Sequence, residues 1–176
     1  MLPFDPVPVL AVGPYLLVPL LPTDFEALYA VAADPEVWAQ HPNKNRYERT
    51  VFQIFFDGAI NSGGAFKIID THTDTIIGST RIYDYNPENS TILIGYTFLA
   101  KAYWSKGANP MIKRMMLDFL FQYVDIVLLH VGVDNIRSQI SIERIGATKT
   151  DCIKVAYIGE PERENFVYAF RKDNWR

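Results

Sequence analysis

The chain has 176 residues, of which 49% are hydrophobic and 14% aromatic, and this composition predicts one folded domain rather than a disordered chain. Its 17 Lys and Arg against 20 Asp and Glu give a net charge of -3, which disfavours non-specific binding to nucleic acid. The lone Cys152 allows no internal disulfide. The uncharged stretch from Pro6 to Thr23 carries too many prolines to span a membrane and lacks the basic start of a signal peptide. We therefore expect a soluble cytoplasmic protein.

The charged residues are unevenly distributed along the chain. Residues 1–43 hold five acidic residues and no Lys or Arg. The stretch from Asn89 to Leu117 holds no carboxylate but carries four basic residues, namely Lys101, Lys106, Lys113 and Arg114. This local excess of positive charge predicts a site for an anion.

The first half of the chain predicts a strand, two helices and three strands. Apolar positions recur at helical spacing after Thr23 or Asp24, either of which can cap the first helix, and the Asp34-Pro35 pair ends it. Turns at 72–74 and 86–90 separate strands that we expect to pair antiparallel. The expected ranges are a strand at 15–20, a second helix at 47–60, and strands at 65–70, 75–83 and 91–99.

The second half predicts alternating helices and strands. Asn109 can cap a helix with Pro110 in its first turn, which continues over 111–123. The apolar run at 126–133 is typical of a strand buried on both faces, and Gly146 ends a helix over 135–145. Strands at 152–158 and 165–171 complete the order βααβββαβαββ, a mixed α/β sheet.

The segment 102–109 follows a strand and opens a helix, so its backbone N–H groups and the positive end of the helix suit a pyrophosphate. Gly107 allows close approach of a ligand, and Lys101 and Lys106 add positive charge. The segment matches neither the phosphate loop GxxxxGK[ST] nor the dinucleotide motif GxGxxG. An ordinary strand-to-helix turn with solvated lysines is the alternative.

Several short motifs stand in a characteristic order. They are IGYTFL at 94–99, WSKG at 104–107, and a segment from Asn135 to Gly146 that reads NIRS and then ERIG. Earlier segments at 17–20, 33–38 and 77–81 fit the same order. Together they resemble the GCN5-related N-acetyltransferase (GNAT) superfamily, and most closely its branch of ribosomal-protein N-terminal acetyltransferase-like proteins. The resemblance runs from about Val12 to Trp175.

This resemblance implies a single GNAT domain over residues 1–176, with residues 1–11 as an N-terminal extension, and acetyl-CoA as the acetyl donor. In the family, the pantetheine arm lies where a central strand splays from its parallel neighbour, and the pyrophosphate rests on the amides of the following turn. The resemblance therefore implies these donor-binding residues: Tyr96, Thr97, Phe98, Ser105, Lys106, Gly107, Ala108, Asn109 and Asn135.

Acetyl transfer to an amine needs a proton acceptor for the amine, a donor for the oxyanion and a proton for the leaving thiolate. A backbone N–H near Phe98 can serve the oxyanion. Ser138 stands where this branch has serine, and we predict it to stabilise the thiolate; the alternative is a serine that bonds the helix backbone. Asp84 is the predicted base. The alternatives are a plain turn residue at this position, a water chain, or one of Glu160, Glu162 and Glu164.

The sequence departs from the family pattern at two positions. Leu93 stands where glutamate often precedes the IGY motif, and Ile142 stands where tyrosine often precedes the EK pair. The leading prediction is an N-acetyltransferase that transfers the acetyl group to a primary amine by direct attack in a ternary complex. The alternatives are a catalytically impaired module that only binds acetyl-CoA, and a structural protein that keeps the fold.

The acceptor is predicted to be a small-molecule amine or a protein N-terminus, with no nucleic-acid or membrane partner. The acidic first quarter favours a cationic amine. One Cys and three scattered His predict no metal site, and the resemblance leaves a homodimer open. Five aromatic residues could line an acceptor pocket or pack in the core: Trp38, Tyr47, Tyr83, Tyr85 and Tyr96.

Overall fold

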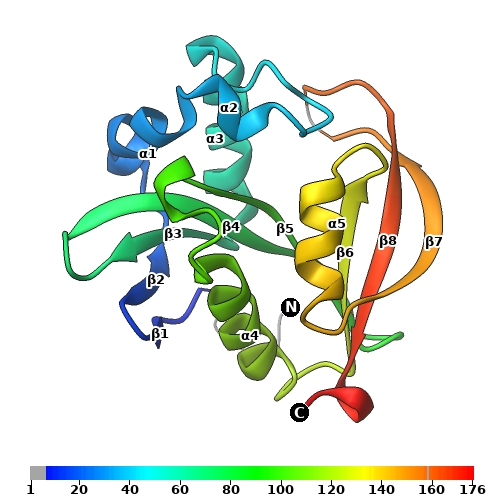
Figure 1. Ribbon diagram of the computed structural model, residues 1–176. Coiled ribbons are helices and arrows are strands. Elements are labelled where there is room, and N and C mark those ends of the chain that lie inside the picture. Colours follow the sequence, from blue (N-terminus) through cyan, green and yellow to red (C-terminus); the bar gives the residue numbers. More distant parts are fainter. Residues whose placement is uncertain (1–6, 158) are drawn as a thin grey trace.

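The computed structural model describes residues 7–157 and 159–176, and in this part a mixed sheet carries helices on both faces (Figure 1). Its eight strands have the order β1-β2-β3-β4-β5-β6-β8-β7. Neighbouring strands pair antiparallel except β5 and β6, which are parallel. The strands are β1 (Leu10–Val12), β2 (Tyr15–Pro19), β3 (Ala65–Asp70), β4 (Thr75–Asn86), β5 (Thr91–Leu99), β6 (Ile126–Gly132), β7 (Thr148–Val155) and β8 (Arg163–Arg171).

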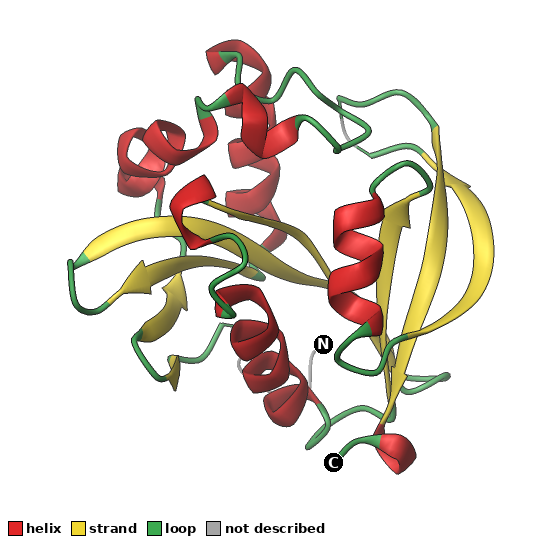
Figure 2. Ribbon diagram, in the orientation of Figure 1, coloured by secondary structure: helices red, strands yellow, loops and turns green. Residues whose placement is uncertain are grey.

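The sheet divides the hydrophobic core into two parts, and helices cover the core on each face (Figure 2). Helices α1 (Phe25–Ala32), α2 (Pro35–Trp38) and α3 (Arg49–Ser62) pack around a core that includes Trp38 and Phe52. Helices α4 (Ala108–Leu120) and α5 (Ile136–Glu143) pack on the other face. In α4, Ala108, Ile112 and Met116 are buried at a spacing of four residues, which gives this helix one apolar stripe against the sheet. No helix of the described residues is long and apolar enough to cross a membrane.

The predicted order of elements is confirmed, with strand β1 and the short helix α2 as additions, and several boundaries differ. The predicted cap of α4, Asn109, lies inside the helix, which instead begins after Gly107 in the left-handed conformation (φ 79°). Strand β7 begins at Thr148 rather than at residue 152, and β4 continues to Asn86. Within the expected N-terminal extension, Leu10 and Ala11 pair with β2, while residues 1–6 lie outside the described residues.

A β-bulge interrupts β5 in the middle of the sheet. The register runs from Arg81 opposite Gly95 to Ser79 opposite Phe98, so β5 has one more residue than β4 between these pairs. Tyr96 takes up this extra residue with a φ of 53°. The bulge turns the strand over: Ile94 packs in the core beneath α4, whereas Phe98 packs in the core beneath α1–α3.

Strands β5 and β6 separate soon after they pair. The register joins Thr91 to Ile126 and continues only as far as Leu93 opposite Leu128. From Ile94 onward, the edge of β5 that faces β6 has no strand partner. Backbone groups that would otherwise be bonded in a ladder are therefore available to a ligand. This is the splay of central strands that the resemblance implies.

The close contact between β4 and β5 beside the bulge depends on a residue without a side chain. A Cβ on Gly78 would collide with the carbonyl oxygen of Phe98, which is backbone and cannot move aside. Gly78→Ala is therefore expected to lower the free energy of unfolding by about 2–4 kcal/mol. Gly58→Ala in α3 is the control, because its Cβ meets nothing within 4 Å and alanine favours a helix by about 0.5–1 kcal/mol. Urea denaturation of the two variants checks the difference, and equal midpoints would contradict it.

Candidate active site

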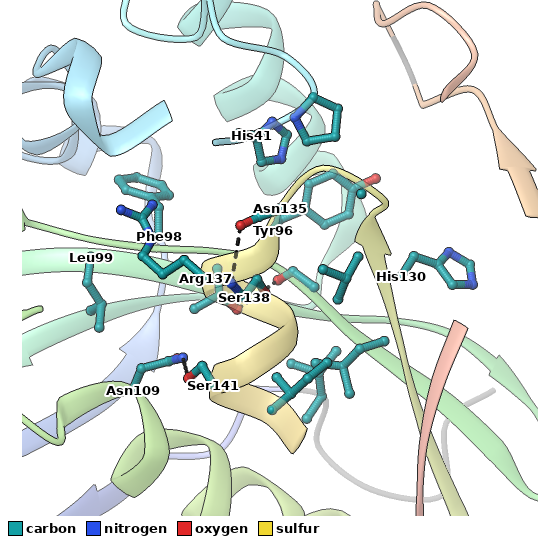
Figure 3. Close-up of a pocket in the computed structure, with 18 of the residues that line it drawn as sticks. His41, Tyr96, Phe98, Leu99, Asn109, His130, Asn135, Arg137, Ser138 and Ser141 are labelled. Atoms are coloured by element: carbon teal, nitrogen blue, oxygen red, sulfur yellow. Dashed lines mark hydrogen bonds between the residues drawn. The ribbon is translucent and has the colours of Figure 1, made fainter. Parts of the chain in front are cut away.

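A cavity of about 610 Å³ lies where β5 and β6 separate (Figure 3). Its wall takes residues from both faces of the sheet. On one face they come from α4, α5 and the turn before α4, including Gly107 and Ser138. On the other face they come from the α2–α3 loop and the β7–β8 connection, including His41 and Tyr157. The splayed strands thus border one cavity that connects the two faces.

The turn before α4 supplies one end of the cavity. Ser105, Gly107, Ala108 and Asn109 line it, and Ser105 has a φ of 59°. The first N–H groups of α4 lack carbonyl partners within the helix, so this end carries partial positive charge. Lys106 lies outside the lining, with its Nζ 6.0 Å from the ring centroid of Tyr103.

Asn109 lies on α4 and faces α5 (Figure 3). Its Nδ2 donates to the Ser141 hydroxyl at 3.0 Å. Its Oδ1 is buried and has no hydrogen-bond partner among the described residues. An unsatisfied buried acceptor is costly, so its position in the cavity wall indicates that a ligand donor completes it. The site therefore fits a ligand that combines an anionic group with an amide donor.

Most of the basic residues at the cavity lie outside the carboxylate-free stretch that the sequence indicates. Of the four basic residues in the carboxylate-free stretch, only Lys113 lines the cavity. Lys101 forms an ion pair with Glu36, and the Arg114 guanidinium lies 5.3 Å from the Trp175 ring centroid. Arg137 and Arg144 line it instead. Arg137 lies in α5 and Arg144 directly follows it, so the two are seven residues apart and lie on one face of the helix. This spacing is a sequence signal that could have identified them as cavity residues.

Lys113 is buried beneath β5. Its Nζ donates to the Thr97 hydroxyl at 2.6 Å and to the Thr80 hydroxyl at 3.4 Å. No carboxylate among the described residues pairs with it. Burial lowers the pKa of the Lys113 ammonium to about 7. The lysine therefore holds Thr97, one of the predicted donor-binding residues, from the side of the sheet that α4 covers.

Asn135 and Ser138 come together at the start of α5. The Asn135 side-chain carbonyl accepts the Ser138 N–H at 3.2 Å and so caps the helix. No acceptor for Asn135 Nδ2 lies within hydrogen-bond distance among the described residues, and both residues line the cavity (Figure 3). Ile142 lines it as well but is a core residue, and the Leu93 side chain is buried.

The other end of the cavity is aromatic. Tyr96 is the centre of this cluster: its ring centroid lies 5.1 Å from that of Tyr83 and 5.3 Å from that of Tyr157. Trp38 and Phe98 adjoin it with centroids 4.9 Å apart. Burial raises the pKa of Tyr96 to about 12, so its hydroxyl is neutral near pH 7. The remaining two of the five predicted aromatic residues do not line the cavity; these are Tyr47 and Tyr85.

An ion pair closes this aromatic end. Glu160, in the β7–β8 connection, accepts from the guanidinium of Arg46 and from the side-chain amide of Asn43. Both carboxylate oxygens are thus occupied. Of the other glutamates predicted as alternative bases, Glu162 and Glu164 are exposed and lie outside the cavity lining.

Asp84 is exposed and lies outside the cavity lining. It takes a φ of 51° within the second irregularity of β4. The four acidic residues of the first quarter that the structure describes also lie outside the cavity lining, and Asp5 lies outside the described residues. Asp24 pairs with Lys67, and Glu26 pairs with Arg49. The structure therefore removes the basis on which the sequence favours a cationic acceptor. No cluster of three or more His, Cys, Asp or Glu side chains suited to a metal occurs in the part of the chain that is described.

The fold and the cavity define an acyltransferase of the GNAT class, and comparison with known proteins agrees. A family model described as "Acetyltransferase (GNAT) domain" matches residues 15–148, and the chain therefore belongs to this family. Its members use acetyl-CoA as co-substrate and act on amine acceptors. No curated protein matches the sequence.

Solved structures resemble the chain at low sequence identity. A GNAT-family acetyltransferase from Bacillus anthracis is 18% identical with a TM-score of 0.76, over 95% of this chain and 100% of that one. A GCN5-related N-acetyltransferase from Brucella melitensis is 16% identical with a TM-score of 0.81, over 98% and 85% of the two chains. RimJ of Mycobacterium smegmatis, solved with CoA-disulfide, is 17% identical with a TM-score of 0.72, over 95% and 87%. These likenesses agree with the fold.

The depressed pKa of Lys113 makes folding stability depend on pH. The unfolded chain binds this proton up to about pH 10.5, whereas the folded chain releases it near pH 7. Stability from this residue therefore rises with pH between these values. We expect the stability advantage of Lys113→Met over the native protein to be larger at pH 6 than at pH 9, by at most about 3 kcal/mol.

Lys106→Met, on the exposed turn nearby, is the control and should leave the pH dependence within about 0.5 kcal/mol of the native curve. Urea denaturation at the two pH values measures both variants. Parallel curves for the native protein and Lys113→Met would show that Lys113 keeps an ordinary pKa.

Proposed function

We propose that the protein transfers an acetyl group from acetyl-CoA to a primary amine by direct attack in a ternary complex. The observation that carries this proposal is the single cavity at the β5–β6 splay, which joins a polar, positively charged end to an aromatic end. A donor and an acceptor that enter from opposite faces of the sheet would meet beside Phe98. Direct attack then requires no covalent intermediate on the protein.

Acetyl-CoA suits the end of the cavity near α4 and α5. Its pyrophosphate would accept from the N–H groups of Ser105 to Asn109, and its pantetheine amides would pair with the unpaired edge of β5 at Tyr96, Thr97 and Phe98. The free Nδ2 of Asn135 and the unsatisfied Oδ1 of Asn109 can complete these bonds. Lys106, near this turn, and Arg144 add positive charge for the phosphates.

Two groups of this chain would serve the reacting carbonyl. A backbone N–H near Phe98 donates to the oxygen as negative charge develops there. The Ser138 hydroxyl, at the start of α5, donates to the departing sulfur. Buried Lys113 keeps Thr97 fixed beside both groups, which supports their preorganisation.

The aromatic end supports an acceptor amine whose body is apolar or aromatic. The carboxylate at this end of the cavity, Glu160, is already bonded to Arg46 and Asn43, so it offers no free negative charge to a polycation. A small-molecule amine of this kind and a protein N-terminus with an apolar first side chain both satisfy this condition. The ring of Tyr96 and the two tyrosine rings beside it would contact either one.

Donor binding is testable without knowledge of the acceptor. Acetyl-CoA is expected to raise the melting temperature, and Gly107→Glu is expected to abolish the rise because its carboxylate opposes the phosphates at the start of α4. Gly107→Gln is the matched control: it imposes the same strain at positive φ without the charge, and should keep most of the rise. Calorimetry decides, and a native protein with no shift would contradict acetyl-CoA binding.

Acetyl transfer is tested by mass spectrometry of a panel of amines incubated with acetyl-CoA. We expect products 42 Da heavier than the parent, an acetyl group in place of a hydrogen, to form from aromatic or apolar amines faster than from polyamines or aminoglycosides, for which the cavity has no free carboxylate. Ser138→Ala should lower kcat by about 10- to 100-fold and keep the acetyl-CoA melting shift. Binding of acetyl-CoA without any product across the panel would favour the module that only binds it.

A further inference from the structure

His130 and Tyr157 form a hydrogen-bonded pair in the wall of the aromatic end. His130 Nδ1 lies 2.9 Å from the Tyr157 hydroxyl oxygen. Both residues line the same cavity as Phe98 and Ser138. His130 is on β6, past the last residue that pairs with β5, and its side chain leaves the strand on the side away from α5 (Figure 3). The pair therefore stands where an acceptor amine would wait.

The surroundings of His130 keep its imidazole neutral near pH 7. Burial lowers its pKa below the usual value, while the Asp84 carboxylate, close to it on β4, raises the pKa and partly offsets this effect. Burial also raises the pKa of the Tyr157 hydroxyl, so that group is a neutral phenol. The other titratable and charged groups that face the pair are, by element, Tyr83 on β4, Tyr96 on β5, Arg46 and His41 in the α2–α3 loop, Glu160 in the β7–β8 connection and Arg163 on β8.

The other candidate bases of the cavity are already occupied. His41 Nδ1 accepts the Asn43 N–H at 3.0 Å, and its Nε2 lies 3.2 Å from a guanidinium nitrogen of Arg46. Burial and this guanidinium hold the pKa of His41 well below its usual range, so it resists a further proton. Glu160 has both oxygens engaged. Among the described residues that line the aromatic end, His130 is the imidazole that faces a hydroxyl rather than a cation.

We propose that His130, acting through the Tyr157 hydroxyl, accepts the proton of the acceptor amine and passes it to solvent beside Asp84. This inference rests on the proposed acetyl transfer and identifies its base. His130 is half-buried and Asp84 is exposed, so the imidazolium formed on His130 has a route to water next to a carboxylate that stabilises it. The sequence indicates Asp84 as the base. In this proposal Asp84 instead acts through its negative charge, which stabilises the protonated form of His130.

The proton transfers balance over one turnover. The acceptor enters as an ammonium ion and gives one proton to the Tyr157 oxygen, as the hydroxyl proton of Tyr157 moves to His130 Nδ1. The neutral amine then forms its bond to the carbonyl carbon, and the C–S bond breaks with its electron pair on sulfur. Sulfur takes the second proton from the amine nitrogen by way of the Ser138 hydroxyl. The products are an amide, the free thiol of CoA, and one proton that His130 releases to water.

This assignment predicts the acid side of the pH profile. Below the pKa of His130 the imidazole already carries a proton, so kcat/KM should fall as the pH decreases through that value. Asp84→Asn removes an interaction that raises this pKa, and the acid limb should therefore move to lower pH. Asp84 is exposed, so this variant tests the coupling without disturbing the core.

The pH dependence of kcat/KM is measured for the native enzyme and four variants, with an acceptor found in the amine panel. His130→Gln keeps an acceptor for the Tyr157 hydroxyl but cannot take a proton, and should lower kcat by about 100-fold and abolish the acid limb. Tyr157→Phe should give a similar loss. His72→Gln is the control, because His72 is exposed in the turn between β3 and β4, and should match the native profile.

A His130→Gln enzyme that keeps its acid limb would overturn the proposal. So would an Asp84→Asn enzyme that loses activity as fully as His130→Gln, since Asp84 would then be the base itself. Each variant must keep the acetyl-CoA melting shift, which separates a lost base from a lost fold. Failure of the proposed function gives another result: the native protein then forms no product from any amine.

Discussion

The parting of β5 from β6 is the constraint on which the site depends. The two strands share only the register from Thr91 to Leu93, and the bulge at Tyr96 then bends β5 and turns it over. A continuous ladder here would bond the backbone of β5 to its neighbour and fill the cavity. The fold gives up these hydrogen bonds, and it recovers stability from separate cores on the two faces of the sheet. The unpaired strand edge is then both the unsatisfied part of the sheet and the place where a donor can bind.

The positions of the charged residues relate to the cavity between β5 and β6. Most ion pairs lie on the surface or at the edge of the cavity, whereas the lysine beneath β5 is held by hydroxyl groups alone. The buried pair of Arg46 and Glu160 ties the α2–α3 loop to the β7–β8 connection, and the two charges of this pair offset each other. We therefore propose that an anionic donor meets helix N–H groups and arginines at one end, and that an uncharged acceptor body meets aromatic rings at the other.

The sequence was a good guide to the elements and a poor guide to the partners of side chains. Hydrophobic patterns and turn residues predict every strand from β2 to β8 to within a few residues, and the sequence before α4 predicts its turn. Strand patterns and turn residues are local signals, which a single sequence contains. The boundary of α4 was misplaced, since Asn109 and Gly107 are both common at helix starts. Arg46 and Glu160 are 114 residues apart in the chain, so no local pattern could join them. His130 and Tyr157 are 27 residues apart, so local pattern does not join them either, and only the structure places the Tyr157 hydroxyl at His130 Nδ1.

The proposed function requires that acetyl-CoA occupies the opened edge of β5 and the start of α4. Hydrogen–deuterium exchange of the native protein, measured with and without acetyl-CoA, tests it most directly. Acetyl-CoA is expected to slow exchange in peptides that cover residues 94–99 and 105–111 and to leave the edge strand β7 unchanged, because only the first two segments are proposed to contact the donor. Protection confined to other segments, with residues 94–99 exchanging at the same rate in both states, would contradict it.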